Sequence, residues 1–231
     1  MKHLRPFELY EYIKYENEIE PKTFEEMLKV LDKFNIPLDK WGTSVYKTPQ
    51  HLWSELKEGE CILFEKDGEL HREVEFVGAR IICKKNGKNY RLWEDKAIFK
   101  DGRVRVRPIP HSMAEKFKAG EDPKEALIRG MEEELGIKID KKQFTFFNSD
   151  IIEDNSDYPG IKSSHRGYYY VVLLKDEQIK NEYIERQKDK DIYFVWREMK
   201  KKPLGYYPMP LGTDKVQLER YEIIQKLYRK Y

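Results

Sequence analysis

Apolar residues recur at helical spacing in the first part of the chain. They form one stripe with Phe24, Met27, Leu28, Val30, Leu31 and Phe34. Thr23 and Glu26 have the spacing of a capping box, in which both side chains bind free amides at a helix start. Thr48 and Pro49 suit the start of a second, shorter helix. We therefore expect a helical N-terminal extension over residues 1–58. Three tryptophans are expected to pack these helices on a sheet: Trp41, Trp53 and Trp93.

From about residue 60 the apolar period changes from that of helices to that of strands. Turn sequences rich in Asp, Asn and Gly separate the runs. The expected strands are 61–64, 73–82, 90–93, 97–99, 104–106, 144–147, 167–174 and 192–196. One helix near 122–135 interrupts them, and an amphipathic helix starting at Thr213 closes the chain. Residues 59–231 are thus expected to form one domain of the α/β or α+β class.

Composition bounds the kinds of partner. The 231 residues are 39% hydrophobic, enough for one large domain or a domain with an appendage. Lys and Arg number 44 against 42 Asp and Glu, so the formal charge of +2 gives no global reason to expect nucleic acid or a membrane. No apolar run approaches the ~20 residues of a membrane span. Cys61 and Cys83 lie in apolar runs, as buried thiols of a reducing compartment do. We expect a cytoplasmic protein.

The segment Gly120–Ile137 has the pattern of a loop, a helix and a stop. Asp122 is a suitable helix cap, and Pro123 suits the first turn. Gly136 is a natural terminator. The sequence therefore predicts a helix whose two ends are both marked by local chemistry.

This helix combines an apolar stripe with neighbouring carboxylates. At ~100° per residue, the face expected to pack on the sheet carries Leu127, Met131 and Leu135. Glu133 and Glu134 fall beside that stripe, whereas Glu132 points the opposite way. With Glu121 from the preceding loop, they make a cluster of hard oxygen donors. Such a cluster suits Mg²⁺ or Mn²⁺ held against a substrate phosphate.

Residues 115–137 resemble the Nudix box, whose family form is G-x5-E-x7-R-E-U-x-E-E-x-G-U, with U an aliphatic residue. The positions that match without a gap are Glu121, Arg129, Met131, Glu133, Glu134, Gly136 and Ile137. Glu115 stands where the family has the opening glycine. Gly130 stands where it has a glutamate that commonly binds metal or helps to activate water. The resemblance implies a Nudix-type α/β/α sandwich with a mixed sheet over about residues 60–200, flanked by the terminal helices.

The resemblance also implies an activity, the hydrolysis of a diphosphate in a nucleotide-like substrate. Glu121, Glu133 and Glu134 would hold Mg²⁺ or Mn²⁺, and the catalytic residues would be Glu133, Glu134 and Arg129, which orients the glutamates. Because Gly130 lacks a carboxylate, a weak or inactive Nudix-like module stays open. Such a module would bind a nucleotide, an RNA end or, through the N-terminal helices, a protein. A third alternative is an unrelated α+β scaffold whose helix has an acidic solvent face.

Residues outside the box supply further candidates. Three arginines alternate along one expected strand and would share a face: Arg103, Arg105 and Arg107. They would clamp substrate phosphates or line a solvated edge strand. His111 would act as a proton shuttle, contact the substrate, or be an exposed loop residue without a role. A ring among Tyr168–Tyr170 would stack on a base or pack in a strand. Tyr206–Pro210 form a substrate-side loop or a rigid connector.

Overall fold

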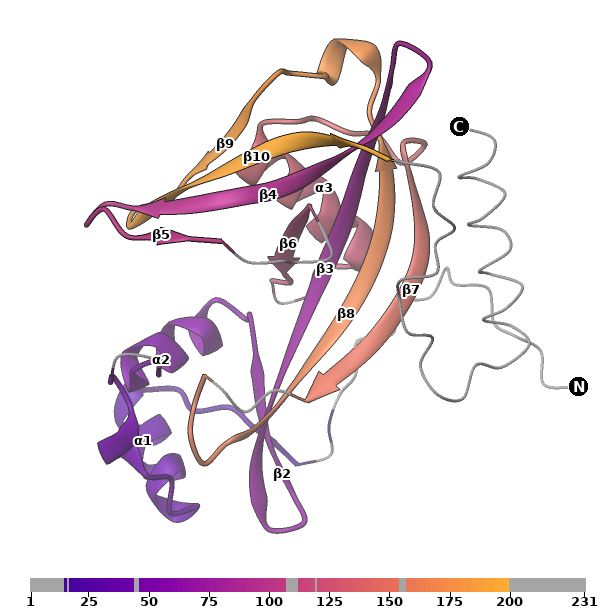
Figure 1. Ribbon diagram of the computed structural model, residues 1–231. Coiled ribbons are helices and arrows are strands. Elements are labelled where there is room, and N and C mark those ends of the chain that lie inside the picture. The colour runs from indigo at the N-terminus through magenta and orange to yellow at the C-terminus, as the bar shows by residue number, and fades with distance from the viewer. Residues whose placement is uncertain are drawn as a thin grey trace, which may run out of the picture. The chain divides into compact units, whose positions relative to one another are not determined.

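The structure, a computed structural model, describes residues 15, 17–43, 46–106, 112–118, 120–153 and 157–199. In chain order its helices and strands (Figure 1) are β1 (Glu18–Ile19), α1 (Phe24–Lys33), η1 (Leu38–Lys40), α2 (Pro49–Lys57), β2 (Ile62–Lys66), β3 (Glu69–Lys85), β4 (Lys88–Phe99), β5 (Val104–Arg105), β6 (Met113–Lys116), α3 (Pro123–Leu135), β7 (Phe144–Glu153), β8 (Lys162–Leu173), η2 (Asp176–Gln178), β9 (Tyr183–Arg186) and β10 (Lys190–Glu198). Within these ranges, three α-helices accompany the hydrogen-bonded strands. The expected α/β class is confirmed.

The chain divides into two compact units that are each assembled from separate segments. The first comprises the chain up to Val77, Glu115–Leu127 and Ser149–Tyr168, and the second comprises Gly78–Ala114, Ile128–Asn148 and the chain from Tyr169. Strands β3, β6, β7 and β8 and helix α3 each supply residues to both units. The division into domains 1–58 and 59–231 stays a prediction.

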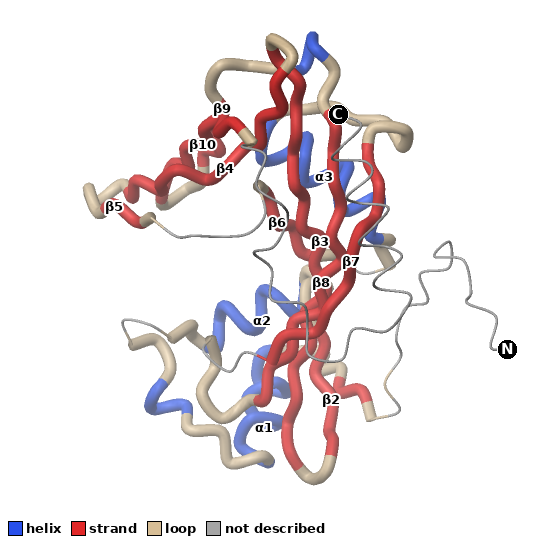
Figure 2. The backbone as a smooth tube through the Cα atoms, turned by 45° about the vertical axis from the view of Figure 1, so that its right-hand side comes forward, coloured by secondary structure: helices blue, strands red, loops and turns tan. Residues whose placement is uncertain are grey.

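Helices α1 and α2 belong to the first unit, beside β2 (Figure 2). Both begin at the expected caps, because Thr23 accepts a hydrogen bond from the amide of Glu26 at 3.1 Å and Thr48 from that of His51 at 3.3 Å. The Glu26 carboxylate accepts from the amide of Lys22, not from that of the cap, so this half of the capping box was predicted wrongly. The helices share a buried core with the sheet: Met27, Leu31, Leu52, Leu63, Leu70, Val74, Tyr158 and Ile161.

The tryptophans differ in their surroundings. Trp41 is buried, donates a hydrogen bond from Nε1 to the carbonyl of Pro159 at 2.9 Å, and has its ring 4.9 Å from that of Tyr158. Trp53 packs against the same core. Trp93 lies in the second unit, on β4. The expectation that tryptophans dock the N-terminal helices therefore fits Trp41 and Trp53 and stays a prediction for Trp93.

Strand β4 organises the sheet of the second unit. It pairs antiparallel with the end of β3, with β5 and with β10, which in turn pairs with β9. Two strands were expected where β4 runs from Lys88 to Phe99, because the polar residues at 94–96 interrupt the apolar pattern. Glu94 and Lys96 nevertheless still pair with β10. A register shift between Tyr193 and Phe194 accommodates this stretch. Strands β1, β6 and β9 were not predicted.

Two further expectations concern a C-terminal helix and membrane-spanning segments. The helix expected from Thr213 lies outside the described residues. Across the part of the chain that the structure describes, no helix has the length and apolar character needed to span a bilayer.

Candidate functional site

Helix α3 begins and ends where its sequence directs. The carboxylate of Asp122 accepts hydrogen bonds from the amides of Lys124 at 2.7 Å and Glu125 at 3.0 Å, as a helix cap does. Gly136 follows the helix with a φ of 63°, a left-handed conformation that suits glycine. The predicted helix near 122–135 is thus confirmed.

The inner face of α3 is fully buried. Its core residues are Ala126, Leu127, Met131 and Leu135. Gly130 is also buried, between the apolar stripe and the glutamates that follow. This firm seating fixes the rotation of the helix about its axis. The direction in which the residues on its other side point is therefore set as well.

That other side carries the glutamates. Glu133 is exposed, and its carboxylate lies 3.1 Å from Nη1 of Arg129, one turn earlier on the helix. Glu134 is half-exposed. Glu132 is exposed and pairs with Lys138 at 3.3 Å, away from Arg129. The predicted contact of Arg129 with a box glutamate is therefore present for Glu133.

Two further positions of the box, Glu121 and Glu115, lie before the helix. Glu121 is half-exposed, and its carboxylate accepts a hydrogen bond from the amide of Lys118 at 2.9 Å. It belongs to the first unit, whereas Glu133 and Glu134 belong to the second. Glu115 is half-exposed on β6. Within the described ranges, no three His, Cys, Asp or Glu side chains gather as a metal-binding group. A metal site built from Glu121, Glu133 and Glu134 stays a prediction.

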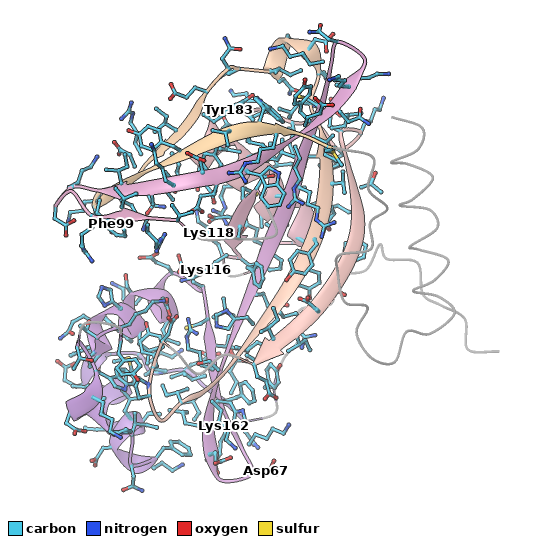
Figure 3. The ribbon with its side chains drawn as sticks, viewed as in Figure 1. Asp67, Phe99, Lys116, Lys118, Lys162 and Tyr183 are labelled. Carbon is cyan, nitrogen blue, oxygen red and sulfur yellow. The ribbon has the colours of Figure 1, made fainter. Side chains whose placement is uncertain are left out.

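The arginines near β5 gather around one aromatic ring. The guanidinium carbons of Arg103 and Arg105 lie 4.8 and 5.5 Å from the ring centroid of Phe99, which ends β4 (Figure 3), and Nζ of Lys190 lies 5.7 Å from it. Hydrogen bonds from the backbone amide and the side chain of Arg103 lower the pKa of Asp101. The result is a positively charged cluster at the end of β4.

These arginines were expected to lie on one strand, but the observed strand is shorter than expected. Strand β5 covers only Val104–Arg105, so Arg103 lies just before it. Both described arginines nevertheless reach the same ring, as a shared face requires. Arg107 lies outside the described residues, as do His111 and Tyr206–Pro210.

Two tyrosines of β8, Tyr168 and Tyr170, pack against other aromatic rings. Tyr170 is buried, with its ring edge-on to those of Phe144 and Phe146, so it has no face open to a base. The ring of Tyr168 stacks on Phe117 with the centroids 5.4 Å apart, and its hydroxyl donates to Glu75 at 3.0 Å. Burial raises the pKa of Tyr168, and the negative charge of Glu75 raises it further. These contacts favour the packing interpretation for both rings.

A buried charge network in the first unit was missed by sequence reasoning. Glu55 on α2 is 7% exposed and accepts hydrogen bonds from Arg72 at 2.6 Å, from Lys47 and Lys116 at 2.9 Å each, and from the hydroxyl of Tyr158 at 3.2 Å. Burial raises the pKa of Glu55, but the cations outweigh it and bring the pKa to about 2. The network therefore holds an ionised carboxylate inside the fold.

Comparison with known proteins finds remote likenesses in structure only. No family model matches the chain, and no curated protein matches it in sequence. A MutT/nudix family protein from Enterococcus faecalis is similar over 66% of this chain and 52% of its own length, about half, with 13% identity and a TM-score of 0.41. The C. elegans Ap4A hydrolase is similar over 54% of this chain and 79% of its own length, with 19% identity and a TM-score of 0.31.

A third similar structure is the NUDIX domain of Shewanella oneidensis NrtR, solved with ADP ribose. It covers 67% of this chain and 88% of its own length, with 11% identity and a TM-score of 0.34. Two of these three structures carry the name of the family that residues 115–137 resemble. Because all three TM-scores are below 0.5, these likenesses carry no argument about the fold or the activity of this chain.

Proposed function

We propose that this protein is a Nudix-type hydrolase that cleaves the diphosphate linkage of a nucleotide-like substrate with Mg²⁺ or Mn²⁺. The observation that carries the proposal is the ion pair of Arg129 with Glu133 on the outer side of α3. It holds one of two adjacent carboxylates in place at the positions that match the Nudix box. The buried inner face of the helix determines which side of the helix carries these carboxylates.

The donor chemistry of Glu133 and Glu134 fits a divalent ion. Mg²⁺ prefers oxygen ligands, keeps several waters, and is commonly bound through one or two carboxylates together with substrate phosphates. Two neighbouring glutamates on one helix meet that need, and Glu121 from the preceding loop is the proposed third ligand. When bound, the ion would neutralise the charge of the phosphates.

The chain's own residues have separate proposed tasks in the reaction. Arg129 positions Glu133 through a charge-assisted hydrogen bond. The oxygen of a water attacks one phosphorus, and the bond from that phosphorus to the bridging oxygen breaks. The bridging oxygen leaves with the second phosphoryl group, and Glu134 accepts the proton that the water loses. Arg103 and Arg105 are proposed to bind phosphate oxygens of the substrate, and the fold is proposed to be the full α/β/α sandwich with both terminal helices.

Gly130 favours a second candidate, a Nudix-like module that binds its ligand without cleaving it. The box glutamate at this position is replaced by a buried glycine, which supplies no carboxylate. Phosphate release from a panel of nucleoside diphosphate derivatives separates the two functions. Release with Mg²⁺ or Mn²⁺ that disappears in Glu134→Gln establishes the hydrolase. A folded protein that is stabilised by a member of the panel but releases nothing is the binding module.

A further inference from the structure

One face of the sheet in the second unit alternates cationic and aromatic side chains. The register of β4 with β10 pairs Arg91 with Arg197 and Lys96 with Tyr193. Residues paired in antiparallel strands lie on the same face, and Trp93 shares the face of Arg91 two positions away. On β4, Leu92, Glu94 and Ala97 point to the opposite face and are buried. We name the set Arg91, Trp93, Lys96, Tyr193 and Arg197 the cationic–aromatic face.

The cations of this face lie against its rings. The guanidinium carbon of Arg91 is 4.2 Å from the ring centroid of Trp93, and that of Arg197 is 5.8 Å from it. The ammonium of Lys96 is 5.8 Å from the ring of Tyr193. Trp93 and Tyr193 are half-exposed and Arg197 is exposed, so part of each ring and the Arg197 guanidinium can be reached from solvent. A planar guanidinium on an indole ring begins a stack that a further planar group can extend.

Positive charge dominates around the rings. On the neighbouring end of β3, exposed Lys84 pairs in register with Asn89 of β4 and lies on the same face. Of the residues that the structure describes, two aspartates of β4 and β10 on this face contact cations. Asp95 lies 3.4 Å from Arg197. Asp191 lies 2.6 Å from Lys100 and 3.3 Å from Arg186. The near-neutral charge of the whole chain therefore conceals a local excess of positive charge.

We propose that the cationic–aromatic face binds single-stranded nucleic acid. Bases would extend the stacks at Trp93 and Tyr193, and the cations would contact the phosphates. Rings on neighbouring strands that are diagonal to each other lie roughly 7–8 Å apart, a spacing that suits successive bases of an extended strand. Stacking on sheet aromatics within a basic surface is a general way to bind unpaired bases. A duplex hides the base faces and offers only its phosphates.

The cationic–aromatic face has no residue in common with the glutamates of α3, so its test needs no metal. A fluorescein-labelled oligouridylate of 12 nucleotides is titrated with the full chain in EDTA, and anisotropy reports binding. The expected result is saturable binding that weakens at higher salt. Trp93→Leu is expected to weaken binding about tenfold or more, because the stack is lost. Arg197→Ala removes an exposed side chain, so the fold is retained; it is expected to weaken binding and flatten the salt dependence.

Controls separate stacking from general charge attraction. Lys29→Ala removes an exposed cation of α1 and is expected to bind like the wild type. Arg197→Lys keeps the charge without the planar group and is expected to bind less tightly than the wild type. The proposal is overturned by an absence of binding up to about 100 µM, the weak end of non-specific affinities. It is equally overturned if Trp93→Leu and Arg197→Ala bind like the wild type, or if a labelled duplex binds as tightly as the single strand.

Discussion

Nη1 of Arg129 lies 3.1 Å from a carboxylate oxygen of Glu133, four residues further along α3. Arg129 is the more buried of the two, with 15% of its side chain exposed against 55% for Glu133. The mostly buried guanidinium of Arg129 thus orients the exposed carboxylate of Glu133. The arrangement suits a residue that positions a ligand for a metal rather than one that touches the substrate.

Replacing Arg129 by Met is expected to slow diphosphate hydrolysis about 10- to 100-fold, the usual effect of losing a residue that orients a metal ligand. Stability should change little, because an i,i+4 ion pair contributes about 0.3–0.5 kcal/mol. Steady-state kinetics and chemical denaturation measure the two effects. Lys138→Met, which removes the partner of Glu132, is the matched control. An unchanged rate in Arg129→Met would remove the positioning role.

Replacing Gly130 by Glu tests whether the missing carboxylate alone weakens the site. The new side chain would stand within one turn of Glu133 and Glu134, and we expect it to tighten Mn²⁺ binding about tenfold in a calorimetric titration. Gly130→Gln has the same size without the charge and controls for the loss of a buried glycine. Equal Mn²⁺ affinity in the two variants would show that the site lacks more than the carboxylate at position 130.

Features set by local chemistry could be predicted from the sequence. Thr23 and Thr48 cap α1 and α2 because their hydroxyls reach amides only three residues away. The contact of Arg129 with Glu133 is equally local, since four residues make one helical turn. The ends of α3 and the apolar stripe beneath its glutamates follow from the same short-range rules.

Features that depend on long-range pairing could not be predicted. Glu55 occupies a polar position of α2, and its partners Arg72, Lys116 and Tyr158 lie 17, 61 and 103 residues away. No local pattern marks it as buried. The arginines at Trp93 come from β4 and β10, and only the register between these strands brings Arg197 to the ring. The continuity of β4 has the same origin.

Replacing Arg105 by Ala tests the substrate role of the cluster around Phe99. If its guanidinium binds a substrate phosphate, KM should rise about tenfold with kcat nearly unchanged, because the contact is made in both the ground state and the transition state. Steady-state kinetics on the best substrate of the panel measure this. Lys188→Ala, at an exposed position, is the control. Unchanged KM in Arg105→Ala would favour the solvated-edge interpretation.

Stability should depend on pH through Glu55. Its pKa is about 2 in the folded protein against an ordinary value of 4.5. The lowered pKa means that ionised Glu55 stabilises the fold fully above pH 4.5 and that this stabilisation is lost as the pH falls from 4.5 towards 2. Urea denaturation at pH 7, 5, 4 and 3 should therefore show a falling free energy of unfolding.

The variant Glu55→Gln isolates that contribution. It leaves three cations around an uncharged group, and we expect a loss of roughly 3–5 kcal/mol at pH 7, as for other broken buried ion pairs. The fall in stability below pH 4.5 should also become shallower. Glu25→Gln changes an exposed carboxylate of α1 and should alter neither quantity. A Glu55→Gln protein as stable as the wild type at pH 7 would contradict the account of this network.

The most direct test of the proposed function compares Glu133→Gln with Glu132→Gln, two neighbouring positions on one helix. Phosphate or nucleoside monophosphate release is measured with Mg²⁺ on the substrate that the wild type cleaves fastest. The account predicts that Glu133→Gln abolishes release with the thermal midpoint nearly unchanged, while Glu132→Gln keeps the wild-type rate. Full turnover in Glu133→Gln, or equal losses in both variants, would contradict a catalytic metal site at the glutamates of α3.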